Sequence, residues 1–283
     1  MDLEREIEKL VSRRVIQITP LSGGCVGQVY CVVLENGLKI VAKSDDRDTA
    51  VLDLEGYMLT FLADNSDLPV PTVLHSSEKL LLMSFMSGES RFSRGAQEHA
   101  AELLSSLHKI SAPAFGFGRD TLIGGLPQPN PWSDLWLDFF RDQRLIYMAN
   151  EGVRTGRLPE EIFIRLQRFC ERLDRWIEEP ESPGLIHGDV WTANVLAEKD
   201  LVVGFIDPAI YFADPEIELA FTTLFGTFST SFFDRYQELT PIRPGFFEER
   251  REIYNLYPLL VHVRLFGDSY VNGIDSTLRR FGF

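Results

Sequence analysis

One carboxylate, one amide and a second carboxylate stand at spacings that suit phosphoryl transfer. Asp189 follows a His-Gly pair, Asn194 lies five residues later, and Asp207 begins an Asp-Pro-Ala run. In nucleotide-dependent phosphoryl transfer, one Asp accepts the proton of the attacking hydroxyl, while an Asn and a second Asp hold the metal ion on the phosphates. The series therefore predicts Asp189 as the catalytic base. It predicts Asn194 and Asp207 as ligands of Mg²⁺, which prefers oxygen atoms.

A glycine-rich loop upstream could cover the phosphates of ATP. It falls at residues 22–30, between two strand-like stretches. Because glycine lacks a Cβ, Gly23, Gly24 and Gly27 would let the backbone approach a phosphate closely. Most glycine-rich hairpins bind nothing, and this is no Walker A loop, since no Gly-Lys-Ser/Thr follows. Cys25 in this loop is either a passive residue or a redox-sensitive thiol.

Lys43 and Glu55 are expected to form an ion pair. Lys43 ends a strand-like stretch, and Glu55 borders the apolar face of a helix expected at residues 48–62. A charge beside a buried face needs a partner. The pair would hold the Lys43 ammonium over the nucleotide phosphates. The alternative is a solvated lysine and a surface glutamate.

The residues near the base leave several roles open. Trp191 lies between the base and the amide, where it belongs either to the core or to a platform for the substrate. His187 is expected to bond the backbone of the catalytic loop, and His108 to be packed in the interior. The three acidic residues that follow Asp207 should cap the next helix and pin the catalytic loop; they are Asp214, Glu216 and Glu218.

The elements that must position these side chains form two groups. Strand-like patterns occur at residues 15–21, 29–34, 38–43, 70–75 and 80–86. Helical periodicity occurs at residues 3–13, 48–62, 96–110, 132–151, 159–178, 217–225 and 251–266. A polar linker at residues 87–90 separates the groups. The backbone before it could hydrogen-bond adenine, through Met83, Ser84, Phe85 and Met86.

This layout predicts an α+β, bilobal protein-kinase-like fold. Residues 1–86 would form a small nucleotide-binding lobe, with a five-stranded antiparallel sheet and one helix. Residues 87–283 would form a larger, mainly helical lobe for catalysis and substrate binding.

Composition is ordinary for a soluble enzyme: 45% of the 283 residues are hydrophobic and 25% are charged. No apolar run approaches the ~18 residues of a membrane span, and the acidic N-terminus is unlike a secretory signal. We therefore expect a cytoplasmic protein without a membrane partner. Three cysteines without CxxC spacing argue against disulfides and zinc. The net charge of −14 disfavours a nucleic-acid partner.

Taken together, the motifs resemble the fructosamine kinase (ketosamine-3-kinase) family, within the aminoglycoside-phosphotransferase and protein-kinase-like fold. The run His-Gly-Asp-Val-Trp with Asn194 is similar to the family motif His-Gly-Asp-Leu-Trp-x-x-Asn. Asp-Pro-Ala at Asp207 stands in place of Asp-Phe-Gly. The resemblance covers nearly the whole chain, and other blocks that carry it are Phe115-Gly116-Phe117 and Asn130-Pro131-Trp132. The chain departs from the family at Ala213-Asp214, where Gly-His is frequent.

The resemblance implies an ATP- and Mg²⁺-dependent kinase that phosphorylates the sugar 3-hydroxyl of ketosamines, and so acts in deglycation. It implies that Trp191 and His262 lie near the sugar, and that Cys25 is the redox-sensitive thiol of the family. The partner would be a small-molecule or protein-bound ketosamine. The protein itself would be a monomer or a redox-dependent homodimer. The alternatives are a kinase of this fold acting on an aminoglycoside, choline or homoserine, and an inactive nucleotide-binding module.

Overall fold

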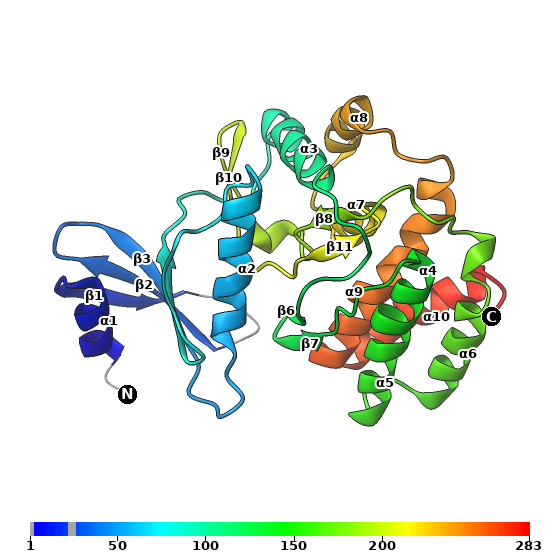
Figure 1. Ribbon diagram of the computed structural model, residues 1–283, viewed down its shortest axis with the longest axis horizontal. Helices are drawn as coiled ribbons and strands as arrows, with labels where there is room; N and C mark the ends of the chain where they lie inside the picture. The colour runs from blue at the N-terminus through cyan, green and yellow to red at the C-terminus, as the bar shows by residue number, and fades with distance from the viewer. Residues whose placement is uncertain (1–2, 22–26) are drawn as a thin grey trace.

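The computed structural model describes residues 3–21 and 27–283. Five strands form one antiparallel sheet, in the order β1-β2-β3-β5-β4. They are β1 (Val15–Pro20), β2 (Gln28–Leu34), β3 (Lys39–Ser44), β4 (Val73–Ser76) and β5 (Leu80–Ser84). Helix α1 (Leu3–Val11) lies beside this sheet, and α2 (Leu52–Asn65) lies between the sheet and the rest of the molecule (Figure 1).

Strand β5 is buried on both faces of the sheet, which explains its unbroken apolar run. Leu80 and Leu82 belong to a cluster with Ile7 of α1, whereas Leu81 and Met83 belong to a cluster with Leu59 of α2. Because successive side chains of a strand point to opposite faces, a strand covered on both sides must be apolar at every position.

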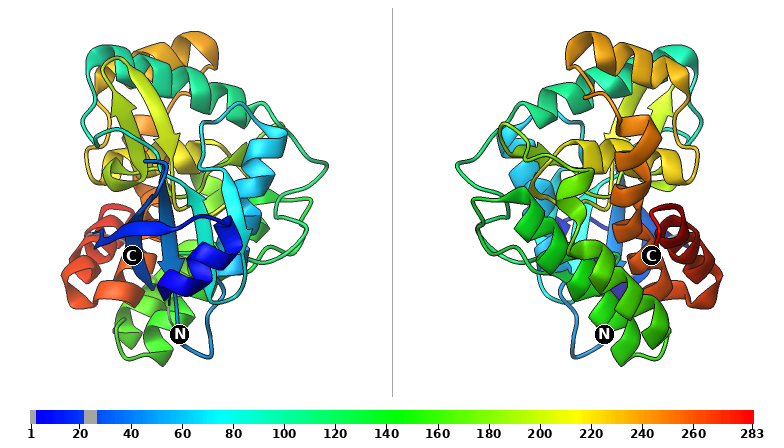
Figure 2. Two further views of the ribbon diagram at one scale, coloured as in Figure 1. Left: turned by 90° about the vertical axis from the view of Figure 1, so that its left-hand side faces the viewer. Right: turned by 90° about the vertical axis from the view of Figure 1, so that its right-hand side faces the viewer.

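Helices dominate the remainder of the chain (Figure 1). They are α3 (Arg94–His108), α4 (Trp136–Phe139), α5 (Tyr147–Arg154), α6 (Glu160–Cys170), α7 (Glu216–Leu224), α8 (Thr230–Leu239), α9 (Arg251–Phe266) and α10 (Val271–Arg280). Short strands form three antiparallel pairs. They are β6 (Thr121–Ile123) with β7 (Leu126–Gln128), β8 (Gly184–Ile186) with β11 (Tyr211–Ala213), and β9 (Val195–Glu198) with β10 (Leu201–Phe205). Both views of Figure 2 show α3 and α8 side by side at one end.

An aromatic contact joins α2 to the helical part. The ring of Phe61 stands edge-on to that of Phe117, with centroids 4.9 Å apart, and Phe117 stacks on Phe212 at 6.0 Å. The guanidinium of Arg119 lies 4.7 Å from the ring of Tyr57. The helix that carries Glu55 is therefore fixed to the larger part of the molecule by aromatic packing.

Two predicted helices differ from the structure. The helix expected at 132–151 begins only at Trp136 and passes through a π-helical segment, Phe140–Ile146, before α5. The helix expected at 159–178 ends at Cys170. The chain then tightens into a 3₁₀ turn, which allows Trp176 to stack on Phe169 with centroids 5.2 Å apart. In a straight helix these residues would be about 10 Å apart along the axis.

The β6–β7 hairpin, strand β11 and helices α8 and α10 were not expected from the sequence. In the described part of the chain, no helix is long and apolar enough to cross a membrane.

Candidate active site

The pairing of β8 with β11 brings Asp189 and Asp207 together. Ile186 at the end of β8 pairs with Tyr211 at the start of β11, so the loop after β8 and the segment before β11 leave the sheet side by side. The backbone nitrogen of Ala209 donates to the carbonyl oxygen of His187 at 2.7 Å. Gly188 has a φ of 87°, and a Cβ there would stand 2.1 Å from the carbonyl oxygen of Ala209. This close approach requires glycine.

Asn194 connects the predicted base to the second aspartate. Its Nδ2 donates to Asp189 Oδ2 at 2.9 Å and to the Asp189 carbonyl oxygen at 3.0 Å. Its own carbonyl oxygen accepts from the backbone nitrogen of Ile206 at 3.0 Å. Asp207 follows with a φ of 54°, a left-handed conformation that non-glycine residues adopt rarely and that recurs at functional sites.

Lys43 lies between two carboxylates. Its Nζ is 2.6 Å from Glu55 Oε1, and it also pairs with Asp207. The Lys43 side chain is only 8% exposed. Burial alone would lower the pKa of Lys43, but the carboxylates of Glu55 and Asp207 raise it above its ordinary value. The ion pair expected from the sequence is therefore present, and it extends to Asp207.

Asp189 lies in an environment that favours its protonated form. Burial raises the pKa of Asp189 to about 8, the Asp207 carboxylate adds to the shift, and the hydrogen bond from Asn194 opposes it. A pKa near neutrality suits a group that exchanges a proton with a substrate. A cation near Asp207 would remove one cause of the increase.

A buried network holds the catalytic loop from behind. Glu218 Oε1 accepts from the backbone nitrogen of Gly188 at 2.6 Å, and its Oε2 accepts from that of His187 at 3.3 Å. His108 Nε2 bonds the same Oε2 at 2.8 Å, and Nδ1 bonds Tyr236 Oη at 2.7 Å. Glu218 thus pins the loop, as expected, and His108 is packed in the interior.

The other two acidic residues stabilise the start of α7. Asp214 Oδ1 accepts from the backbone nitrogen of Glu216 at 3.1 Å, and Asp214 also pairs with Arg243. Glu216 forms a buried ion pair with Arg250 at 2.6 Å. Both carboxylates therefore have partners within the protein.

The ring of Phe225, which no sequence motif indicated, lies between those of Trp191 and His262. The centroid of Phe225, at the end of α7, lies 5.7 Å from Trp191 and 4.9 Å from His262. Tyr270 and Phe266 stand 4.9 and 5.5 Å from His262. Trp191 is half-buried, so it belongs to an aromatic cluster beside the base and not to the interior.

His262 has a defined tautomer. Its Nδ1 lies 2.7 Å from the carbonyl oxygen of Pro258. Since a carbonyl oxygen only accepts, Nδ1 is the donor. Burial lowers the pKa of His262, against the smaller effect of this hydrogen bond. The neutral ring at pH 7 therefore carries its free lone pair on Nε2.

Comparison with known proteins identifies the family. A family model described as fructosamine kinase matches residues 3–281. The chain belongs to the fructosamine kinase family. It is 32% identical over 278 residues to a probable ketoamine kinase of Synechocystis, a match covering 94% of this chain and 90% of that protein. It is 29% identical to the chloroplastic protein-ribulosamine 3-kinase of Oryza sativa subsp. indica, with 94% and 80% covered.

Solved structures confirm the kinase-like fold. A crystal structure from Thermobifida fusca, described as a candidate fructosamine-3-kinase, matches with a TM-score of 0.88 and 29% identity, covering 98% of this chain and 97% of that one. An aminoglycoside phosphotransferase in a ternary complex with ADP and hygromycin B matches at 16% identity, with a TM-score of 0.70 and full coverage of both chains. This second likeness concerns the fold alone.

For this member of the fructosamine kinase family, the structure describes the predicted phosphate loop only from Gly27 onward. Gly27 has a φ of 68°, and a Cβ there would stand 2.5 Å from the carbonyl oxygen of Ser44. Gly27 therefore lies against the end of β3, one residue after Lys43. The predictions for Gly23, Gly24 and Cys25 lie outside the described residues.

The predicted adenine-binding residues lie where β5 leaves the sheet. Met83 is buried and pairs with Val41 of β3. Ser84 is the last residue of β5, and its backbone nitrogen donates to Thr72. Phe85 and Met86 follow outside the strands, and Met86 lies against Gly204 of β10.

The donor set fits Mg²⁺ bound together with nucleotide phosphates. Among the described residues, no group of three or more His, Cys, Asp or Glu side chains could hold a metal by itself. Mg²⁺ is usually held by one or two carboxylates, with phosphates and water completing its shell. The Asp207 carboxylate and the Asn194 side-chain oxygen supply that partial set. Asn194 donates with its nitrogen, so its oxygen remains available.

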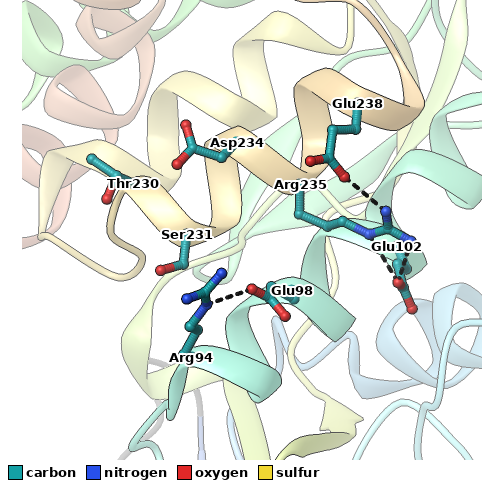
Figure 3. A pocket seen from close by; sticks show the side chains of 8 residues that line it. All are labelled: Arg94, Glu98, Glu102, Thr230, Ser231, Asp234, Arg235 and Glu238. Carbon is teal, nitrogen blue, oxygen red and sulfur yellow. Dashed lines mark hydrogen bonds and ion pairs between the residues drawn. The ribbon is translucent and has the colours of Figure 1, made fainter.

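A charged groove elsewhere is separate from this site. It has a volume of about 560 Å³, lies between α3 and α8, and contains none of the predicted site residues (Figure 3). Its arginines are paired within it, Arg94 with Glu98, and Arg235 with Glu102 and Glu238. The groove is therefore a set of surface ion pairs, not part of the candidate active site.

Proposed function

We propose that this protein is an ATP- and Mg²⁺-dependent kinase that phosphorylates the sugar 3-hydroxyl of ketosamines. The observation that carries the proposal is the continuous set of contacts at the site. Lys43 joins Glu55 to Asp207, and Asn194 joins the Asp207 segment to Asp189. Membership of the fructosamine kinase family, and the relative named protein-ribulosamine 3-kinase, support the choice of acceptor.

In this proposal, each side chain acts on one part of the reaction. Asp189 orients the acceptor hydroxyl and takes its proton as the bond to phosphorus forms. Lys43, held by Glu55, binds the nucleotide phosphates. Asn194 and Asp207 hold Mg²⁺, which would supply positive charge to the phosphate oxygens. These residues would therefore stabilise the charge that spreads over the transferring phosphoryl group.

The acceptor would bind at the aromatic cluster. Trp191 lies two residues after the proposed base. The rings of Trp191, Phe225 and His262 together offer apolar faces for the C–H groups of a sugar. His262 Nε2 can accept a hydrogen bond from a sugar hydroxyl. We infer a free or protein-bound ketosamine as the substrate, because this cluster recognises the sugar and not the amine.

The remaining predictions belong to the same proposal. Residues 1–86 would hold the nucleotide, and residues 87–283 the catalytic groups and the acceptor. The loop of Gly23, Gly24 and Gly27 would cover the phosphates, and the backbone near Met83 and Met86 would bind adenine. Since the reaction consumes ATP, we infer a cytoplasmic protein. Cys25 as a redox thiol, and a monomer or redox-dependent dimer, are further parts of the proposal.

An ADP-release assay with a panel of acceptors tests this function. We expect turnover with fructoselysine or ribuloselysine, and much less with an aminoglycoside, choline or homoserine. Asp189→Asn should abolish turnover while leaving ADP binding intact. Asp275→Asn, at a partly buried aspartate of α10 that pairs with Arg165, is the matched control. No turnover with either ketosamine would refute the proposed substrate, and full activity of Asp189→Asn would refute the assigned base.

A further inference from the structure

The segment after Asp207 is clamped by the partly buried β6–β7 hairpin, which supplies none of the site residues described so far. β6 and β7 are joined by Gly124 and Gly125, whose φ values of 53° and 79° are typical of a tight two-residue hairpin turn. Thr121 and Gln128 face each other across the hairpin and are 1% and 0% exposed. We propose that Thr121 and Gln128 are positioning residues that hold Asp207 in its metal-binding orientation.

Both side chains bond the backbone two and three residues after Asp207. Gln128 Nε2 donates to the carbonyl oxygen of Ala209 at 3.0 Å and to Thr121 Oγ1 at 2.9 Å. Thr121 Oγ1 donates to the carbonyl oxygen of Ile210 at 3.3 Å. On the other side, the Ala209 nitrogen donates to His187, as described above. Residues 209 and 210 are therefore held between the hairpin and the catalytic loop.

Asp207 needs such support because its backbone is strained. A φ of 54° is unfavourable for an aspartate, and such conformations persist only where surrounding contacts over-determine them. Pro208 fixes its own φ and biases the residue before it toward extended conformations, so it does not favour the left-handed Asp207. The hydrogen bonds at Ala209 and Ile210 are the nearest downstream constraints on the direction in which the Asp207 carboxylate points.

A buried arginine holds the hairpin. Arg144 donates to the carbonyl oxygen of Pro129 at 2.7 Å and to Asn130 Oδ1 at 2.5 Å, and it lies 3.8 Å over the ring of Tyr211. Asn130 Nδ2 donates to Thr121 Oγ1 at 2.8 Å. Within the described part of the chain, no ion pair is seen for Arg144: neutral oxygens and aromatic rings surround its charge, and its buried Nε has no hydrogen-bond partner. A cationic donor polarises the Asn130 amide and strengthens its bond to Thr121.

The Ala209 carbonyl oxygen settles the orientation of the Gln128 amide, because it can only accept and must face Nε2, which leaves the amide oxygen to Tyr257. The hydroxyl of Tyr257 donates to Gln128 Oε1 at 2.7 Å. With the oxygen occupied in this way, Gln128 Nε2 faces the two acceptors at Ala209 and Thr121. The Thr121 hydroxyl accepts two hydrogen bonds and donates one, which is its full capacity.

The test uses variants that remove one polar group and keep the shape. Thr121→Val removes the hydroxyl, and Gln128→Met removes the amide. Thr222→Val is the matched control, because Thr222 is equally buried and bonds only the Leu219 carbonyl within α7, at 2.7 Å. Two quantities are measured: the gain in ADP affinity on adding Mg²⁺, by calorimetry, and hydrogen exchange of residues 205–213 without ligand.

We expect Mg²⁺ to tighten ADP binding by the same factor in the wild type and Thr222→Val. In Thr121→Val and Gln128→Met that factor should fall on the order of tenfold, with the metal-free ADP affinity changed less than about twofold. Hydrogen exchange of residues 205–213 should rise in these two variants alone. Thr121→Ser, which keeps the hydroxyl, should restore the wild-type factor.

The inference rests on the proposed function only in taking Asp207 as a metal ligand. The inference would be overturned if Mg²⁺ tightened ADP binding in both variants by the same factor as in the wild type, and hydrogen exchange of residues 205–213 were also unchanged. If Mg²⁺ did not tighten ADP binding to the wild type, the proposed function would fail instead, and the exchange data would still decide whether the clamp exists. If Thr121→Val did not fold, Gln128→Met would decide in the same way.

Discussion

Replacement of Glu218 by Gln should loosen the catalytic loop without changing its shape. The substitution preserves one acceptor, so the bond from the Gly188 nitrogen can remain. The second oxygen becomes an amide group that faces the His187 nitrogen, another donor, and so the hydrogen bonds to Oε2 are lost or weakened. The buried negative charge that attracts His108 also disappears.

The magnitude follows from the bonds that Glu218 makes. A hydrogen bond to a charged group contributes about 1.5–3 kcal/mol, and one such bond is lost while another is weakened. We therefore expect the free energy of unfolding to fall by about 2–3 kcal/mol at neutral pH. A displacement of Asp189 by a fraction of an ångström should lower kcat by roughly 10- to 100-fold. KM for ATP should change little, because Glu218 contacts no nucleotide-binding residue.

The effect should depend on pH in a defined direction. Burial alone would raise the pKa of Glu218, but the hydrogen bond and charge of His108, with the Gly188 nitrogen, lower it. A carboxylate with a lowered pKa in the folded state contributes stability that is complete above its unfolded pKa of about 4.3. This stability is lost as pH falls through the folded value. The difference between wild type and Glu218→Gln should therefore be largest near pH 7 and shrink below about pH 4.

Urea denaturation at several pH values and steady-state kinetics measure these effects. Glu102→Gln is the matched control, because Glu102 pairs with Arg235 on the surface, and its loss should leave stability and kcat nearly unchanged. A Glu218→Gln variant as stable and as active as the wild type at pH 7 would refute the reasoning. So would a loss of stability that grows toward acid.

Two further predictions concern the base and the aromatic contact of α2. Burial and the Asp207 carboxylate raise the pKa of Asp189 to about 8, and Mg²⁺ would remove the second of these causes, so binding of Mg-ADP at pH 7 should release a fraction of a proton. Calorimetry in buffers of different ionisation enthalpy measures this release, which should vanish in Asp189→Asn and decline above pH 8. Phe117→Ala should lower the free energy of unfolding by about 3–4 kcal/mol. A double-mutant cycle with Phe61→Ala should give a coupling of about 1 kcal/mol, and a coupling of zero would mean that the rings pack independently.

The contact between Asp189 and Asn194 could be predicted from the sequence because it is local. Asp189 and Asn194 lie on one short loop, where spacing alone places them together. The pair of Lys43 and Glu55 followed from the end of a strand and the apolar face of the next helix. The contact of Lys43 with Asp207 could not be predicted from spacing, since it joins residues 164 positions apart.

The acceptor side was harder to predict, because its rings come from separate elements. Phe225 ends a helix and Tyr270 lies in a short 3₁₀ turn, and only tertiary packing places both beside His262. Helix α8 was missed because it buries only Phe232 and Tyr236, which leaves a weak apolar stripe. The Gly124-Gly125 pair could have indicated the β6–β7 hairpin, since such a dipeptide is a known turn signal. Nothing in the sequence marks Gln128 or Arg144 as buried, because both residue types are usually exposed.

The aromatic contact between α2 and the helical part also bears on how such an enzyme could be inhibited or switched. An outward swing of α2 would take Glu55 away from Lys43 and separate Phe61 from Phe117, breaking the ion pair and a ring contact of about 1 kcal/mol. Compounds that trap a displaced form of this helix would have to overcome that energy before binding. Selective inhibitors are therefore better directed at the Trp191–Phe225–His262 cluster, the proposed acceptor site, where no such rearrangement is needed.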